Sequence, residues 1–239
     1  MSALKRFFVE KIEPVTELCG EEFEHAKNVL RIGVGAELIL LDNSGKEFTA
    51  VVSAVEKKRM LLNVVREEAG CREAQNDVCL LFGYLKNADK NEFIVQKAVE
   101  LGVKKIGVFS SEFSSAYMNG NKLERLNKVA KEAAKQCLRA VAPEIVYFDK
   151  FERALAFTEG YQNKVFACEF ATKSEIALEK IAGSTALVVG SEGGFSREEA
   201  LLAKEKGYAL VTLGKRILRA ETAAVALTAV AMFSLGELR

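Results

Sequence analysis

From Val78 to the C-terminus, short apolar runs typical of strands alternate with segments of helical periodicity. Strands are expected at Val78–Leu85, Lys105–Phe109, Ile145–Phe148, Val165–Cys168, Ala186–Val189 and Ala209–Leu213. Helices are expected at Glu92–Leu101, which stops at Gly102, and at Lys122–Ala140, which Pro143 closes. This alternation predicts an α/β domain with a mostly parallel sheet, because parallel neighbours need a crossover connection and a helix supplies it.

The first 66 residues follow a different pattern, in which β-forming runs are separated by polar turns. The three runs are Leu38–Leu41, Phe48–Val55 and Leu61–Val65. This spacing predicts hairpins in a compact β-rich barrel, with one short helix around Glu22–Leu30. The polar segment Glu67–Asp77 is expected to be the linker to the α/β domain.

Composition limits the classes of function that remain. The 239 residues carry 34 basic and 33 acidic side chains, so nucleic-acid binding requires a local basic patch. The only histidine, His25, argues against a His-rich zinc site, and no metal is expected. Five cysteines without a CxxC motif favour reduced thiols in a cytoplasmic protein. No apolar run approaches the length of a membrane span.

Two glycine-rich loops are the candidate ligand site. The first, Gly190–Gly194, follows a buried strand and precedes a capping box of Ser196 and Glu199. The second runs from Val211 to Thr222 and leads into an apolar helix. Ligands bind at the carboxyl ends of parallel strands, where glycine permits close approach of the backbone. One crossover helix separates the loops, so we expect neighbouring strands that face one pocket. A ligand-free turn and a surface ion pair are the alternative interpretations.

A basic stripe is expected on the predicted helix Lys122–Ala140. Lys128, Lys131, Lys135 and Arg139 recur at spacings of three, four and four residues, which places them on one side of a helix. Such a stripe on a nearly neutral protein is a candidate contact for the phosphates of RNA. The alternative is a solvated helix face.

The loop sequences VVGSEGGFS and LGKRILRAETA resemble the paired motifs of the RsmE family of ribosomal RNA uridine methyltransferases, in the SPOUT superfamily. The resemblance runs nearly end to end and includes Arg6–Val9, His25 with Val29–Arg31, Phe93–Gly102, Gln136, Arg139 and Pro143. The chain departs from the family at Phe113, Lys135 and Leu138, which replace a common Arg, a common Glu and a small residue. These departures lie in the region expected to touch RNA.

The resemblance implies an α/β SPOUT methyltransferase domain with a trefoil knot at residues 71–239, after a PUA-like RNA-binding β-barrel at residues 1–70. It implies a homodimer that transfers a methyl group from S-adenosylmethionine (SAM) to N-3 of a uridine in small-subunit (16S) ribosomal RNA. Implied catalytic residues are Arg219 and Glu221. Implied cofactor-binding residues are Gly190, Ser191, Glu192, Gly193, Gly194, Leu213, Gly214, Ile217, Leu218 and Arg219. Implied RNA-binding residues are Arg6, Arg31, Lys97, Lys131, Lys135 and Arg139.

Two other functions stay open at this point. One is a SPOUT methyltransferase that acts on a ribose 2′-hydroxyl or on transfer RNA, against which the N-terminal barrel and the segment FIVQKAVELG argue. The other is an RNA-binding or assembly protein without catalysis, against which the two intact glycine loops argue. The helix Thr222–Leu235 is apolar nearly all round, which predicts that a second subunit covers part of it.

Overall fold

The computed structural model describes residues 4–171 and 173–238, and they form two compact units. The first unit takes the described residues up to Glu73 together with the distant segment Ala134–Ala142. The second unit takes Ala74–Ala133 and the described residues from Pro143 onward. Within the described residues, none of the helices has the length and apolar character that crossing a membrane requires.

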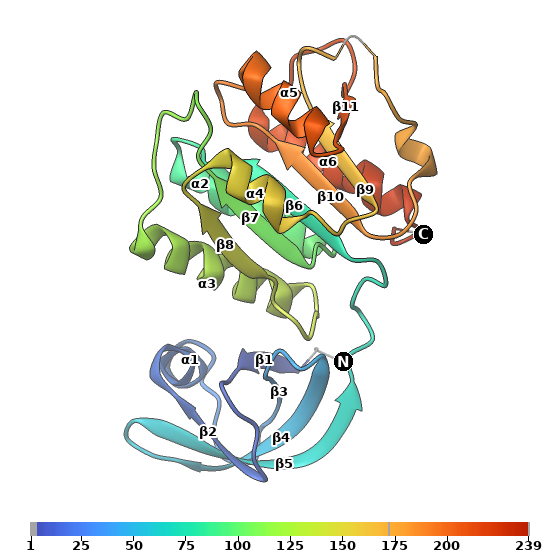
Figure 1. The fold of residues 1–239 in the computed structure, drawn as a ribbon. Coiled ribbons are helices and arrows are strands. Elements are labelled where there is room, and N and C mark those ends of the chain that lie inside the picture. Colours follow the sequence, from blue (N-terminus) through green and yellow to red (C-terminus); the bar gives the residue numbers. More distant parts are fainter. Residues whose placement is uncertain (1–3, 172, 239) are drawn as a thin grey trace. The chain divides into compact units, whose positions relative to one another are not determined.

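The first unit is built on a curled five-stranded sheet with the order β1-β3-β4-β5-β2 (Figure 1). β1 pairs with β3 in parallel, and the other pairs are antiparallel. Its elements are β1 (Lys5–Phe8), β2 (Val15–Cys19), α1 (Gly20–Glu24), the π-helical turn η1 (His25–Val29), β3 (Glu37–Leu41), β4 (Lys46–Val55) and β5 (Arg59–Ala69).

Two long strands give this sheet its curvature. The register between β4 and β5 shifts at Thr49/Ala50 and again at Val52/Ala54, and such bulges bend a strand. Alternate side chains then enclose a core that contains Phe7, Leu40 and Leu62. β5 extends to Ala69, because that residue pairs with Lys46 on β4, so the predicted linker is shorter than Glu67–Asp77.

The second unit contains a six-stranded sheet with the order β11-β9-β10-β6-β7-β8, in which all neighbours are parallel. The prediction of an α/β domain with a parallel sheet is therefore confirmed. Its strands are β6 (Val78–Gly83), β7 (Lys105–Phe109), β8 (Glu144–Phe148), β9 (Asn163–Ala167), β10 (Thr185–Val189) and β11 (Ala209–Val211). Its helices are α2 (Ala88–Glu100), α3 (Gly120–Gln136), α4 (Phe151–Phe157), the short 3-10 helix η2 (Leu178–Lys180), α5 (Arg197–Glu205) and α6 (Ala220–Ser234). The last residues of α3 belong to the first unit.

Helices cover both faces of this sheet, with α4 and α5 on one face and α2 and α6 on the other (Figure 1). Phe109, Phe166 and Phe195 pack together in the core beneath α4 and α5, with the ring centroids of Phe166 and Phe195 4.2 Å apart. β9 lies between β10 and β11, so the expectation that the two glycine loops follow neighbouring strands is wrong. The trefoil knot stays a prediction.

The helix expected at Lys122–Ala140 ends earlier, at Gln136. Leu138 adopts a left-handed backbone with φ of 65°, which cannot continue a right-handed helix. Arg139 therefore stands beyond the helix, and the four predicted basic residues do not share one helical face.

The apolar helix α6 is buried on one side. Ala224, Leu227 and Ala231 are fully buried, and the helix contacts α2, β6 and β10. Val230 remains 41% exposed and Phe233 55% exposed. These two side chains mark the part of α6 that the second unit itself leaves accessible.

Candidate active site

A cavity of about 710 Å³ lies where β9, β10 and β11 end, within the second unit. Its volume falls within the range of roughly 300–1,000 Å³ usual for small-molecule sites. Both predicted glycine loops line it, although β9 separates the strands that lead into them. Of the ten predicted cofactor-binding residues, nine line the cavity: Gly190, Ser191, Glu192, Gly194, Leu213, Gly214, Ile217, Leu218 and Arg219.

The first loop is a tight turn held by its own backbone. Ser191 and Gly194 form an isolated bridge, in which the Gly194 N–H donates to the Ser191 carbonyl at 3.0 Å. The Glu192 carboxylate accepts from the Lys86 N–H at 3.1 Å, which ties the turn to the chain beyond β6. The Ser191 hydroxyl is buried and has no hydrogen-bond partner among the described residues. It is a polar group on the cavity wall that a ligand can satisfy.

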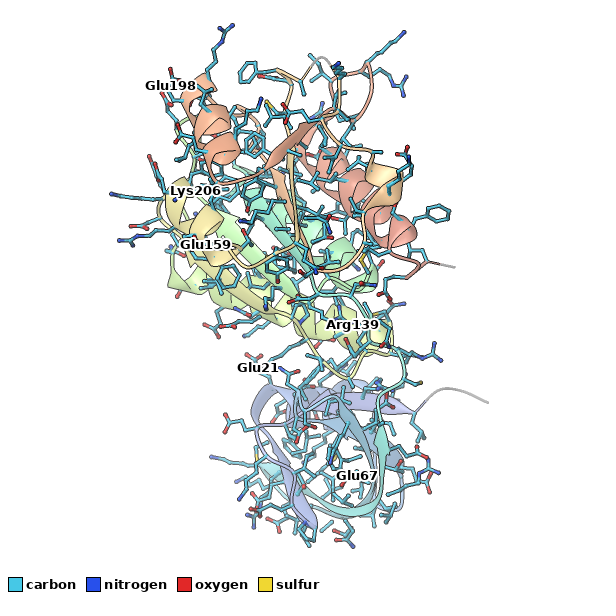
Figure 2. The ribbon with its side chains drawn as sticks, turned by 45° about the vertical axis from the view of Figure 1, so that its right-hand side comes forward. Glu21, Glu67, Arg139, Glu159, Glu198 and Lys206 are labelled. Atoms are coloured by element: carbon cyan, nitrogen blue, oxygen red, sulfur yellow. The ribbon has the colours of Figure 1, made fainter. Side chains whose placement is uncertain are left out.

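The predicted capping box follows this turn and is confirmed. The Ser196 hydroxyl accepts from the Glu199 N–H at 3.2 Å, and the Glu199 carboxylate accepts from the Ser196 N–H at 2.9 Å. Its other oxygen accepts from the Glu112 N–H at 2.9 Å. Glu198, on the same first turn of α5, points outward (Figure 2). Glu199 thus fixes both the start of α5 and the loop after β7.

Gly193 does not line the cavity. A Cβ atom at this position would lie 2.6 Å from the Cβ of Phe113 and 2.8 Å from its carbonyl oxygen. The missing side chain therefore lets the loop after β7 pack against the glycine turn. Its part in forming the cavity is indirect.

The second loop offers unpaired backbone groups to the cavity. The Thr212 N–H donates to the Ser174 hydroxyl at 3.3 Å, after which the N–H groups of residues 213–218 donate to no described residue. Gly214 has a φ of 104°, which side chains rarely tolerate. Ile217 is 91% exposed although it is apolar. Free N–H groups beside apolar side chains suit a ligand with a flat ring and polar edges.

The predicted catalytic residues both line the cavity, Arg219 as the N-cap of α6 and Glu221 on its first turn. Glu221 Oε1 lies 3.0 Å from the Lys90 ammonium on α2, so Glu221 pairs with Lys90 rather than with Arg219. Its Oε2 is buried and accepts from no other described residue. Partial burial acts to raise the pKa of Glu221. Hydrogen bonds from its own N–H and from Lys90, with the charge of Arg219, outweigh burial and hold the pKa below its ordinary value.

Sequence reasoning missed the lining residues Lys90 and Glu169, and it gave no role of their own to Thr212, Lys215 and Arg216. Lys215 and Arg216 stand inside the second motif, so their place in the loop was a usable signal. Lys90 and Glu169 come from α2 and from the end of β9, and no local pattern joins them to the glycine loops.

The predicted basic stripe is not a continuous solvent-exposed surface. Lys128 and Lys131 are exposed, whereas Lys135 is buried and its ammonium lies 3.0 Å from Glu22. Arg139 is also buried, and its guanidinium donates to Glu73 at 2.8 and 3.0 Å. The solvated-face alternative is therefore wrong for Lys135 and Arg139, because both are buried and paired with carboxylates of the first unit. Their contact with RNA stays a prediction.

The other predicted RNA contacts differ in accessibility. Arg6 is 9% exposed at its side chain, and its Nη2 forms an ion pair with Glu47 at 2.6 Å without the alignment of a hydrogen bond. It is therefore as poorly placed for a phosphate as Lys135. Lys97 is half-buried, pairs with Glu100 at 2.9 Å and lies over the Phe93 ring. Arg31 is exposed, with a φ of 54°.

We expect Lys131→Gln and Lys135→Gln to have different effects. Lys131→Gln should reduce the slope of RNA affinity against salt concentration by about the amount expected for one phosphate contact. Its free energy of unfolding should equal that of the parent. Lys135→Gln leaves Glu22 without this cation and should lower the free energy of unfolding by about 1–3 kcal/mol. Urea denaturation and RNA titration at several salt concentrations measure the two quantities. If Lys135→Gln has a flattened salt slope and parental stability, Lys135 contacts RNA and does not stabilise the fold through Glu22.

Two family models match the chain. Residues 72–232 match the family model of an RNA methyltransferase domain, and residues 18–65 match that of an RNA methyltransferase PUA domain. The fold and the cavity thus define an RNA methyltransferase that carries a PUA domain. The chain is 32% identical to ribosomal RNA small subunit methyltransferase E of Bacillus subtilis, over 92% of this chain and 93% of that protein. It belongs to the ribosomal RNA small subunit methyltransferase E family.

Solved structures resemble the whole chain. Ribosomal RNA small subunit methyltransferase E from Neisseria gonorrhoeae, bound to SAM, is 28% identical and has a TM-score of 0.86 with 98% of each chain covered. A Legionella pneumophila protein described as a methyltransferase, in complex with SAM, is 26% identical with a TM-score of 0.87. It covers 97% of this chain and 98% of its own.

Proposed function

We propose that this protein transfers a methyl group from SAM to N-3 of a uridine in small-subunit (16S) ribosomal RNA. The observation that carries the proposal is the cavity, which both glycine loops line together with Arg219 and Glu221. The names of the relatives support ribosomal RNA of the small subunit as substrate, and the two SAM-bound structures support the cofactor.

The residues of the cavity fit SAM. Leu213, Leu218 and Phe195 supply apolar surface for a purine ring, and the N–H groups of residues 213–218, which donate to no described residue, can pair with its edge or with the sugar. The unpartnered Ser191 hydroxyl and the exposed Lys215 can bind the polar methionine end. When bound, SAM supplies a methyl group that its sulfonium charge already activates. The protein therefore needs no nucleophilic Ser or Cys.

The protein's own task is to make N-3 of the uracil reactive. This nitrogen carries a proton at neutral pH. It must lose that proton to attack the methyl group, so negative charge develops on the uracil. Arg219 is exposed on the cavity wall and remains positively charged, so it can stabilise that developing charge. Glu221 stays ionised through its ion pair with Lys90 and the charge of Arg219, and we assign it the role of orienting Lys90.

We also propose a cytoplasmic homodimer. The Cys residues among the described part of the chain are all free thiols, which suits a reducing compartment where ribosomal subunits are made. Val230 and Phe233 leave part of an otherwise apolar helix accessible, and a second copy can cover it.

The dimer is expected to persist at micromolar concentration in sedimentation experiments. Val230→Asp places a charge on the accessible part of α6 and should shift the protein toward monomers. Val34→Asp, at a 67% exposed position in the first unit, is the matched control and should leave the mass unchanged. A parent protein that sediments as a monomer contradicts the assembly.

The activity is tested by supplying labelled SAM and the purified protein to small ribosomal subunits from a strain that lacks the gene. The expected product is 3-methyluridine at one position, identified by mass spectrometry of nuclease fragments. Methylation confined to a ribose hydroxyl or to transfer RNA contradicts the proposal.

A further inference from the structure

The loop between β7 and α3 exposes two aromatic side chains on the second unit. Phe113 is 49% exposed and Tyr117 is 71% exposed, although both rings are large and apolar. Single exposed aliphatic residues are ordinary, whereas two aromatic rings on one short loop indicate a contact with another molecule.

Hydrogen bonds hold this loop in place. The Ser111 N–H donates to the Ser114 hydroxyl at 2.8 Å, and the Ser114 N–H donates to the Ser111 carbonyl at 3.0 Å. The Lys122 ammonium donates to the Tyr117 carbonyl at 2.8 Å. Met118, next to Tyr117, is buried and anchors this part of the loop. The aromatic rings are therefore presented by an ordered backbone, which lowers the entropy that binding costs.

The same loop contacts the glycine turn of the candidate active site. Gly193 leaves room for Phe113, since a Cβ there would lie 2.6 Å from the Phe113 Cβ. Glu112, the preceding residue, donates its N–H to Glu199 in the capping box. Phe113 is thus fixed beside the turn whose other residues line the cavity.

We infer that Phe113 and Tyr117 form a stacking platform for unpaired bases of the RNA that flank the methylated uridine. The inference rests on the proposed function. Sequence-specific RNA recognition uses unstacked bases laid on aromatic rings, and N-3 of a uridine is accessible only when its base pair is open. A platform beside the cavity holds the neighbouring bases once the target base leaves the stack.

The surroundings of the two rings favour RNA over a protein partner. Ser111, Ser114, Ser115 and Asn119 lie in the loop and are at least partly exposed. Hydroxyl and amide groups suit sugars and phosphates, whereas the centre of a protein–protein interface is enriched in apolar residues. Lys122 adds a positive charge at Tyr117 that can meet the RNA backbone.

The test measures the affinity of a small-subunit ribosomal RNA fragment for the parent protein and four variants. Phe113→Ala should weaken RNA binding roughly 5- to 150-fold, which is the range for losing one base stack. Phe113→Tyr keeps a flat ring and should restore binding, while Phe113→Leu keeps apolar volume and should not. Leu201→Ala, at a 61% exposed position on α5, is the control for losing exposed apolar area.

Calorimetry with SAM and thermal unfolding establish that each variant is folded and that its cofactor site is intact. Parental RNA affinity in Phe113→Ala, or full recovery in Phe113→Leu, overturns the stacking platform. A change in sedimentation with unchanged RNA affinity overturns it as well and assigns the surface to protein contact. A parent protein that methylates no ribosomal RNA refutes the proposed function instead, so the two failures are distinguishable.

Discussion

Arg219→Ala should lower kcat for RNA methylation by about 100-fold or more, while the Kd for SAM stays close to the parental value. The side chain lines the cavity and is exposed, and Glu221, whose pKa its charge helps to lower, keeps its ion pair with Lys90 when Arg219 is removed. Loss of one preorganised charge that acts mainly on the transition state typically has an effect of this size. Single-turnover methylation with saturating SAM, together with calorimetry, separates the two quantities.

Arg216→Ala is the matched control for this experiment. Arg216 is another exposed arginine on the same cavity wall, three positions earlier in the loop. Its removal changes the net charge equally and should alter kcat far less. Equal losses in the two variants would mean that general positive charge, rather than the position of Arg219, supports the reaction.

Gly214→Val should abolish measurable SAM binding while the protein remains folded. The backbone at Gly214 has a φ of 104°, and a β-branched side chain forces it out of that region at a cost of roughly 1–3 kcal/mol or more. A Cβ added at this position would meet no described atom within 4 Å, so the loop can move without disrupting the core. The N–H groups of residues 213–218 then leave the arrangement that faces the cavity. Calorimetry with SAM measures the loss.

Gly207→Val separates backbone strain from loss of the site. Gly207 has a φ of 83° and open space around it, but it lies after α5 and does not line the cavity. Gly207→Val should lose about as much stability as Gly214→Val, but it should bind SAM with the parental affinity. Parental affinity in Gly214→Val would remove the second loop from the cofactor site. Gly193→Val acts differently, because it pushes Phe113 away from the glycine turn.

Much of the fold could be predicted from the sequence because its determinants are local. Buried parallel strands such as Val78–Gly83 are continuous apolar runs, and the Ser196–Glu199 capping box marks the start of α5 directly. The order of the strands in the sheet, in contrast, is not determined by local sequence. Nothing near β10 or β11 encodes that β9 lies between them, because a parallel crossover of similar length can reach the next strand or the one beyond.

The candidate site was likewise predictable only in part. The glycine loops were identifiable since each combines a strand end with small residues, and both do line the cavity. The burial of Lys135 could not be predicted, because the sequence pattern of an amphipathic helix is the same whether a lysine on it faces solvent or a carboxylate such as Glu22. Lys90 was missed for a related reason, since its carboxylate partner lies on α6, far away in the sequence.

The segment Ala134–Ala142 has a consequence for how the protein is made. Glu73 accepts hydrogen bonds from Arg139 and from the N–H groups of Ala140 and Val141, and Asn43 accepts from the Ala142 N–H at 3.0 Å. The N-terminal unit therefore lacks part of its structure until residue 142 has left the ribosomal exit tunnel. By then β6 and β7, the first two strands of the second unit's sheet, have already emerged. The N-terminal unit therefore cannot complete its structure before part of the second unit has been synthesised.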